Sequence, residues 1–214
     1  MLDPKGAVRE LKATDPVLAR LIDEVGPCRL EPTQWSPFQA LTRSIVYQQL
    51  SGKAAATILK RVVALFPERE FPTPEDLLEV SEERLRGAGL SQNKFRALRD
   101  LAEKTLGGLV PSREDMGAMS DEEIIERCVA VRGVGRWTVE MLLMFHLGRP
   151  DVLPLDDLGI RKGAALVYRM RKLPDARRLA RTGAPWRPHR TVASWYLWRA
   201  LELPEDAVAR IRAR

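Results

Sequence analysis

Residues 131–138 read VRGVGRWT, a Gly-x-Gly turn with a helical pattern on each side. Upstream, residues 120–125 are typical of a capped amphipathic helix, and residues 139–145 downstream form an apolar run. Because glycine lacks a Cβ and tolerates positive φ, such a turn lets backbone amides approach a partner closely. The N-terminus of the second helix adds a favourable field for an anion. We therefore expect a helical hairpin that binds phosphate.

The composition sets the class of protein. The chain has 214 residues, enough for one large domain or two small interlocked ones. Hydrophobic residues make up 45% and charged residues 30%, which argues against disorder. No apolar run approaches the roughly 20 residues of a membrane span, and the N-terminus lacks the apolar core of a signal peptide. Cys28 and Cys128 offer neither a disulfide framework nor an iron–sulfur ligand set, so we expect a reducing cytoplasm.

The positive charge is concentrated in the last third of the chain. The net charge is +6, and residues 161–214 contain 14 Lys and Arg against 4 Asp and Glu. Such a basic segment suits a polyanionic partner. A solvated arginine-rich surface explains the same charge, so charge alone leaves nucleic acid as one of two interpretations.

Helical patterns with proline, glycine and capping residues between them run along the whole chain, and no segment alternates like a strand. We predict an all-α protein with a loop over residues 109–119. A second Gly-x-Gly sequence, residues 87–89, is either a second hairpin or a helix C-cap, and the C-cap is favoured. Helices are expected over residues 17–25, 37–46, 53–66, 93–106 and 176–181.

Asp156 and Asp157 begin the next helical pattern, about twenty residues after the hairpin. Acidic residues at a helix start commonly cap backbone amides and complement the helix dipole. A capping role does not exclude chemistry, because a carboxylate beside a helix N-terminus is suited to stabilise a cationic transition state. We therefore retain Asp157 as a candidate catalytic group.

Other side chains carry weaker signals. His146 lies on an apolar stretch, and His189 lies among arginines; neither has a serine or cysteine partner that would make a hydrolase triad. The chain has no phosphate loop ending in Gly-Lys-Ser/Thr, which excludes a nucleoside-triphosphatase site of that type. Among the tryptophans, which are core candidates, Trp137 and Trp186 lie beside turns, where an indole can stack on a base.

Four motifs together resemble the helix-hairpin-helix (HhH-GPD) DNA glycosylases, and most closely their bacterial 3-methyladenine DNA glycosylase II (alkylpurine) subgroup. The motifs are IVYQQLSGKAA at residues 45–55, GLS…K at residues 89–94, RGVGRWT at residues 132–138 and LPLDDLGIR at residues 153–161. Their order and separation fit the family over about residues 35–200.

The resemblance implies an all-α fold of two interlocked helical subdomains with an active-site cleft between them. We place these subdomains at about residues 36–115 and 116–200, the latter with the N-terminal segment. The resemblance also implies a monofunctional enzyme of base excision repair that flips an alkylated purine, such as 3-methyladenine or 7-methylguanine, and hydrolyses its N-glycosidic bond. Asp157 is the implied catalytic residue. Bifunctional relatives carry a lysine where Trp137 stands, so no lyase activity is expected.

The remaining site residues follow from the same motifs. Met141 and Leu158 stand where longer members of the subgroup have pocket aromatics, which leaves the breadth of substrates open. The implied lesion pocket comprises Trp137, Trp186, Asp156, Leu158 and Met141. The implied DNA-binding residues are Gln48, Gln49, Leu50, Ser51, Gly133, Val134, Gly135, Arg136, Thr138 and Arg161, with Gln49 or Leu50 filling the gap left by the flipped base.

No cofactor is expected to be required. A monovalent cation, Na⁺ or K⁺, is a further hypothesis for the hairpin, held by the backbone carbonyls of Val129, Val131 and Val134. The expected partner is damaged double-stranded DNA, bound by a monomer in the cytoplasm at the nucleoid. The alternatives are a glycosylase for another base, either an oxidised purine or a mismatch, and a non-enzymatic helix-hairpin-helix DNA-binding module. Asp157 and the Gln48-Gln49 pair favour the enzyme, since simple binding requires neither.

Overall fold

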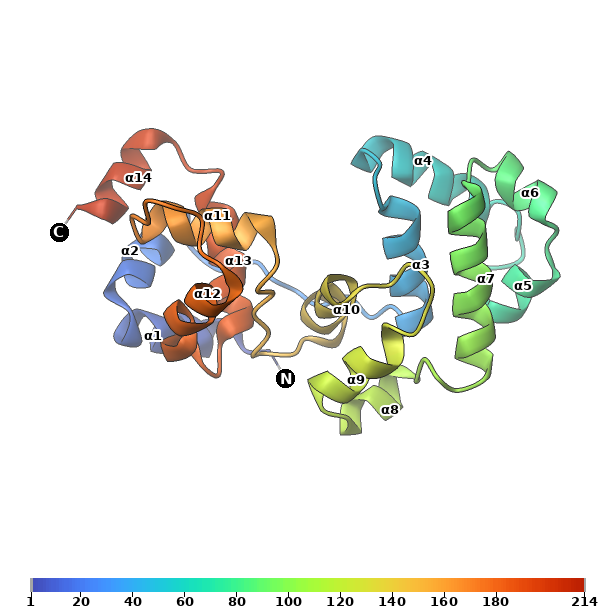
Figure 1. Cartoon of the computed structure of the whole chain (residues 1–214), viewed down its shortest axis with the longest axis horizontal. Coiled ribbons are helices and arrows are strands. Elements are labelled where there is room, and N and C mark those ends of the chain that lie inside the picture. The colour runs from blue at the N-terminus through green and yellow to red at the C-terminus, as the bar shows by residue number, and fades with distance from the viewer. Residues whose placement is uncertain (1, 214) are drawn as a thin grey trace. The chain divides into compact units, whose positions relative to one another are not determined.

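A computed structural model describes residues 2–213, and its regular elements over that range are all helical (Figure 1). These residues form two compact units. One unit is the continuous segment Thr33–Leu142, and the other combines the residues up to Pro32 with those from Leu143 onwards. Within the described range, no helix is long and apolar enough to cross a membrane.

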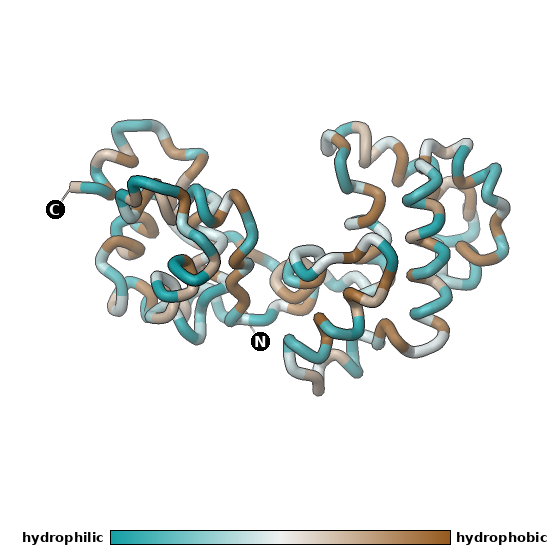
Figure 2. The backbone as a smooth tube through the Cα atoms, in the orientation of Figure 1, coloured by the Kyte–Doolittle hydropathy of each residue, from teal (hydrophilic) through white to brown (hydrophobic). Residues whose placement is uncertain are grey.

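The unit Thr33–Leu142 is built around α7, which packs against α3 and α5 (Figure 1). Leu41 and Ile45 of α3 and Leu98 and Leu101 of α7 are fully buried. Along α7, hydrophobic and hydrophilic positions alternate with the turns of the helix (Figure 2), so one face is buried. The helices of this unit are α3 (Pro37–Tyr47), α4 (Gly52–Val63), α5 (Pro74–Glu79), α6 (Glu82–Gly87), α7 (Gln92–Leu106), α8 (Arg113–Ala118), α9 (Asp121–Cys128) and α10 (Arg136–Leu142).

The second unit packs α11 against α13, with α2 beside α13 (Figure 1). Gly163 makes the α11–α13 approach possible, because a Cβ at this position would lie 2.1 Å from the carbonyl oxygen of Leu197. The elements of this unit are α1 (Pro4–Thr14), α2 (Pro16–Val25), the π-helical turn η1 (Leu143–Leu147), α11 (Leu158–Val167), α12 (Ala176–Thr182), the 3-10 turn η2 (Ala184–Trp186), α13 (Arg190–Ala200) and α14 (Glu205–Arg212).

Short polar side chains set most of the helix starts. Ser120 accepts the backbone N–H of Glu123 and Glu123 accepts that of Ser120, which is a capping box at the start of α9. The same reciprocal arrangement of Ser112 and Asp115 begins α8. These caps satisfy amides that have no partner within the helix, so the local sequence fixes where each helix begins.

The all-α class and the predicted helices are confirmed, with three local corrections. The helix expected over residues 53–66 ends at Val63. The loop expected over residues 109–119 is wrong, because the Ser112–Asp115 capping box forms α8 within it. Helices α1 and α14 were not predicted. Gly89, at φ 109°, follows α6 and Leu90 N–H donates to the Leu85 carbonyl, so the second Gly-x-Gly sequence is a helix C-cap.

The two compact units also differ from the predicted subdomain boundary at residues 115–116. Residues 116–142 group with residues 33–115, since α10 packs on α3 and the Gln48 side chain donates to the carbonyl of Gly133. The N-terminal segment joins the part of the chain after Leu142, where α1 and α2 pack against α13.

Candidate active site

Asp157 is the N-cap of α11. Its Oδ1 accepts the backbone N–H of Ile160 at 2.7 Å and the indole N–H of Trp198 at 2.9 Å. The side chain is half-buried. Two donors from separate elements hold one oxygen, so the orientation of the carboxylate is fixed by the fold and not by solvent. The capping role that the sequence predicted is confirmed.

Trp198 reaches this carboxylate because the residue between them is small. A Cβ at Gly159 would lie 2.8 Å from Cδ1 of Trp198 and 3.1 Å from Oδ1 of Asp157. The Trp198 ring stacks on Phe145 with centroids 5.7 Å apart and an interplanar angle of 26°. Thus α13 and η1 supply an aromatic pair beside the cap of α11, and both rings are half-buried.

The neighbours of Asp157 divide into exposed and structural side chains. Asp156 is exposed, and Leu158 is 52% exposed although it is hydrophobic. Arg161 is half-buried and donates its Nε–H to the carbonyl of Pro174 at 2.7 Å. That bond ties the Arg161 side chain to the segment after α11, so its predicted DNA contact is restricted to the remaining guanidinium N–H groups.

The hairpin turn has the conformation expected of its glycines. Gly133 has φ 75°, which favours glycine, and Gly133 and Gly135 are exposed. The carbonyl of Gly135 accepts the N–H groups of Thr138 and Val139 and so begins α10. Val134 is buried, which anchors the turn in the core while the glycines on either side face solvent.

Two of the predicted DNA-binding residues, Arg136 and Thr138, have side chains that are engaged within the protein. Arg136 donates Nη1–H and Nη2–H to the Glu122 carboxylate at 2.6 and 2.9 Å, and its Nε–H to Glu140 at 3.2 Å. The Arg136 hydrogen bond lowers the pKa of Glu122 below its ordinary value. Thr138 is buried, so its side chain does not present a DNA contact. The Thr138 side chain therefore belongs to the core and Arg136 links α9 to α10, while DNA binding by this part of the hairpin stays a prediction.

The turn between α3 and α4, residues 48–51, is exposed at its tip. Gln49 has φ 57°, a left-handed conformation that is uncommon for a residue other than glycine, and both Gln49 and Leu50 are exposed. Leu50 is 40% exposed, which is unfavourable for an apolar side chain without a partner. Ser51 caps α4 by accepting the N–H of Ala54. We call residues 48–51 the wedge turn.

The predicted pocket tryptophans have opposite environments. Trp137 lies in the first turn of α10 and is 48% exposed, and Met141 on the same helix is half-buried. Trp186 is fully buried in the core and donates its indole N–H to Asp15 at 2.9 Å. The prediction that Trp186 stacks on a base is therefore wrong, because its faces are already packed.

The carbonyls proposed for a monovalent cation lie at the start of the hairpin. The Val131 carbonyl accepts the N–H of Val134 at 3.0 Å and retains a second lone pair. Val129 is 39% exposed, whereas Val131 and Val134 are buried. Neutral carbonyl oxygens at a turn suit a weakly hydrated cation, so these donors fit the hypothesis chemically.

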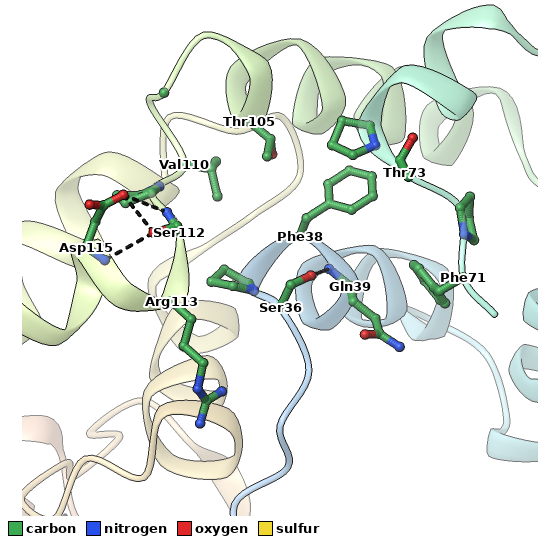
Figure 3. A pocket seen from close by; sticks show the side chains of 15 residues that line it. Ser36, Phe38, Gln39, Phe71, Thr73, Thr105, Val110, Ser112, Arg113 and Asp115 are labelled. Carbon is green, nitrogen blue, oxygen red and sulfur yellow. Dashed lines mark hydrogen bonds between the residues drawn. The ribbon is translucent and has the colours of Figure 1, made fainter. Parts of the chain in front are cut away.

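The unit Thr33–Leu142 contains a cavity of about 590 Å³ that is not lined by the predicted site residues (Figure 3). Phe38, Thr73, Thr105 and Ser112 line it, together with the hydrogen-bonded side chain of Asp115. It contains none of the site residues predicted from the sequence. The cavity therefore does not form the predicted lesion pocket.

The predicted residues fall into two groups. Asp156, Asp157, Leu158 and Arg161 belong to the unit that contains α11, together with Trp198 and Phe145. The hairpin, the wedge turn, Trp137 and Met141 belong to the unit Thr33–Leu142. The cleft between these units remains a prediction from the sequence.

Sequence reasoning missed Trp198, Phe145 and Gly159 as members of the site. Only Gly159 carried a local signal, because a glycine inside a predicted helix usually marks a place where another group packs closely against the backbone. Trp198 is 41 residues from Asp157, and no periodicity connects the two positions.

Comparisons with known proteins identify the family of the chain. A family model described as "HhH-GPD superfamily base excision DNA repair protein" matches residues 42–188. The chain is 39% identical to DNA-3-methyladenine glycosylase 1 of Schizosaccharomyces pombe, over 88% of this chain and 82% of that protein. It is also 34% identical to an alkylbase DNA glycosidase-like protein of the same yeast, over 94% and 95%. The solved structure of the S. pombe 3-methyladenine DNA glycosylase in complex with abasic DNA is similar, with TM-score 0.81, 38% identity, and coverage of 92% and 97%.

Proposed function

The chain belongs to the HhH-GPD superfamily of base excision DNA repair proteins, and we propose that it is a monofunctional glycosylase that releases alkylated purines from duplex DNA. A relative that is 39% identical is named DNA-3-methyladenine glycosylase 1, which supports 3-methyladenine as a substrate; 7-methylguanine is part of the proposal because it is also an alkylated, positively charged purine. The observation that carries the proposal is the carboxylate of Asp157, held by two donors at the start of α11.

The proposed reaction needs one carboxylate and one water. Alkylation at N3 or N7 leaves the purine positively charged, so the base departs as a neutral molecule with the electrons of the C1′–N bond. The sugar then carries oxocarbenium character, which the Asp157 carboxylate stabilises electrostatically. Water adds its oxygen to C1′ and loses a proton, and the products are the free base, an abasic site and a proton.

Binding is assigned to the exposed turns of the other unit. The Gly133 and Gly135 backbone would contact a phosphate, and Gln49 or Leu50 of the wedge turn would enter the base stack after the damaged nucleotide is flipped. Leu50 suits this role because it is exposed and apolar, and apolar side chains of this kind can wedge between base steps.

Trp137 supports hydrolysis without strand cleavage. A lyase needs an amine that forms a Schiff base with the sugar, and an indole cannot supply one. The exposed indole instead offers a face for an electron-poor alkylated base. A monovalent cation on the carbonyls of Val129, Val131 and Val134 would add positive charge near a bound phosphate.

The test is release of free 3-methyladenine and 7-methylguanine from methylated duplex DNA by the wild type and by Asp157→Asn. We expect release by the wild type and a loss of about a hundredfold or more in the variant, the usual magnitude when a preorganised stabilising group is removed. The proposal fails if the wild type releases neither base. Release of an oxidised purine or a mismatched base would indicate a different substrate class.

A further inference from the structure

Lys94, in the first turn of α7, holds the start of the wedge turn. Its ammonium donates to the carbonyls of Val46 at 2.7 Å and Gln48 at 2.9 Å, at the end of α3. The side chain is half-buried, and burial lowers the pKa of this ammonium below its ordinary value. The two hydrogen bonds offset the cost of partly desolvating this cation, and they fix the backbone from which Gln49 and Leu50 project.

The other end of α7 holds the start of the hairpin turn. Asp100 accepts the backbone N–H of Arg132 at 2.6 Å and the ammonium of Lys104 at 2.7 Å. Lys104 also donates to the carbonyl of Ala130 at 2.6 Å. One carboxylate and one ammonium on adjacent turns of α7 thus bind a donor and an acceptor of the hairpin backbone.

The middle of α7 lies against the hairpin glycine. A Cβ at Gly133 would lie 3.7 Å from the Cβ of Ala97, which is buried. The Gln48 side chain donates Nε2–H to the carbonyl of Gly133 at 2.9 Å, a direct bond between the two turns. Residues 94, 97, 100 and 104 follow helical spacing and share one face of α7. Both turns therefore rest on one face of a single helix.

We propose that Lys94 is a positioning residue that, with Gln48, fixes the wedge turn relative to the hairpin turn. The inference rests on the proposed function, since it assigns a role in DNA binding to both turns. In the proposed function the hairpin binds a phosphate and the wedge turn enters the base stack. The spacing of the two turns therefore determines where along the duplex the wedge turn enters. A displacement of about 1 Å can lower a rate by about a hundredfold. Both turns lie within the unit Thr33–Leu142, which keeps the spacing independent of the rest of the chain.

The experiment follows insertion of the wedge directly. The probe is a duplex with a stable abasic-site analogue and 2-aminopurine as the adjacent base, whose fluorescence rises when it is unstacked. Lys94→Met removes the ammonium and keeps the length of the side chain. Lys60→Met is the matched control, because Lys60 is an exposed lysine of α4 in the same unit. Affinity for an undamaged duplex, single-turnover release from methylated DNA and the melting temperature are measured on the same proteins.

Lys94→Met is expected to lower the fluorescence rise at saturating protein to less than half and to slow base release by about tenfold. Affinity for the undamaged duplex should change less than about threefold, because the phosphate contacts remain. The control should match the wild type. A folded Lys94→Met with fluorescence and release within twofold of the wild type overturns the inference, as does an equal loss of release and undamaged-duplex affinity.

Gln48→Ala serves as the second variant if Lys94→Met does not fold. It removes the direct bond between the turns at a half-buried position, and the same loss of fluorescence with retained affinity is expected. Wild-type behaviour of Gln48→Ala on both readouts then overturns the inference. If the wild type itself gives no fluorescence rise and releases no base, the proposed function fails. If the wild type is active and the variants behave like it, the positioning role alone fails.

Discussion

The two compact units contribute different kinds of functional group. The unit Thr33–Leu142 presents backbone, at the exposed glycines of the hairpin, and an exposed apolar side chain on the wedge turn. The other unit presents one carboxylate, Asp157, held by a helix start and by an indole from α13. In the first case the shape of a turn determines what is offered to a partner. In the second case the identity of one side chain determines what is offered to a partner.

This difference predicts how each unit responds to substitution. A backbone site tolerates changes to side chains around it as long as the turn keeps its conformation, whereas a carboxylate site depends on single atoms. Changes near Asp157 should lower the rate of base release at saturating DNA. Changes in the hairpin should lower affinity and leave that rate nearly intact.

The largest effect is expected for Asp157→Asn, compared with Asp175→Asn, which changes the N-cap aspartate of α12. Asparagine keeps the helix cap but removes the charge that stabilises the sugar cation, so release should fall by about a hundredfold to a thousandfold. Affinity for duplex DNA should change less than about threefold, since counterion release by the phosphate contacts is unaffected. Asp175→Asn makes the same change of charge at an exposed helix cap outside the predicted site and should leave release unaltered. Equal losses in both variants would show that total charge, and not Asp157, matters.

Trp198→Phe should lower base release by about tenfold, because it removes the hydrogen bond to the Asp157 carboxylate and retains an aromatic ring beside Phe145. Trp195→Phe is the control, since Trp195 lies on the same helix and packs edge-on against Tyr196. Single-turnover kinetics at saturating DNA measure the effect. A Trp198→Phe rate equal to that of Trp195→Phe would remove Trp198 from the site.

Gly133→Ala should weaken duplex binding by about tenfold, because a non-glycine residue at φ 75° costs about 1–2 kcal/mol. The release rate at saturating DNA should stay within about threefold of the wild type. Gly117→Ala in α8, where an added Cβ meets nothing within 4 Å, controls for loss of a glycine. Titration of a fluorescent duplex gives the affinity. Unchanged affinity in Gly133→Ala would count against the hairpin as the phosphate site.

The smallest effect concerns stability and pH. Burial raises the pKa of Asp100, but the hydrogen bonds from Arg132 and Lys104 outweigh it, so its pKa lies below the usual 3.8. Ionised Asp100 therefore contributes its full stabilisation when the pH is above 3.8, the ordinary pKa that applies to the unfolded chain. This stabilisation is lost as the pH falls through the lower pKa of the folded state. Urea unfolding should show a stability advantage of wild type over Asp100→Asn at neutral pH that shrinks in acid. An advantage that does not change with pH would contradict this.

The sequence predicts the fold well where local chemistry determines structure. Ser36, Thr73, Ser91 and Ser120 each begin a helix that the pattern indicated, because a cap acts over three residues. Helix α8 was missed although Ser112 and Asp115 form a capping box, since no proline follows Ser112 as Pro74 follows Thr73 and no apolar period develops. Membership of residues 116–142 in one unit depends on contacts with α3, which no local pattern reports.

The candidate site was predictable only in part. Asp157 and the hairpin glycines follow from motifs, and the structure gives them the expected cap and turn. The predicted stacking of Trp186 on a base is wrong, because its burial depends on residues far along the chain, such as Asp15, and the ion pair of Arg136 with Glu122 was likewise not visible in the sequence. Trp198 was missed for the same reason, since its bond to Asp157 spans 41 residues.

The identity of the products tests the proposed hydrolysis most directly. Methylated duplex DNA, labelled at one 5′ end, is incubated with the wild-type protein, and free bases and strand breaks are counted in the same sample before any alkaline treatment. Hydrolysis with Trp137 in place of a Schiff-base lysine predicts one free alkylated purine per abasic site, with the labelled strand intact. Strand cleavage in step with base release, or the absence of any free base, would contradict it.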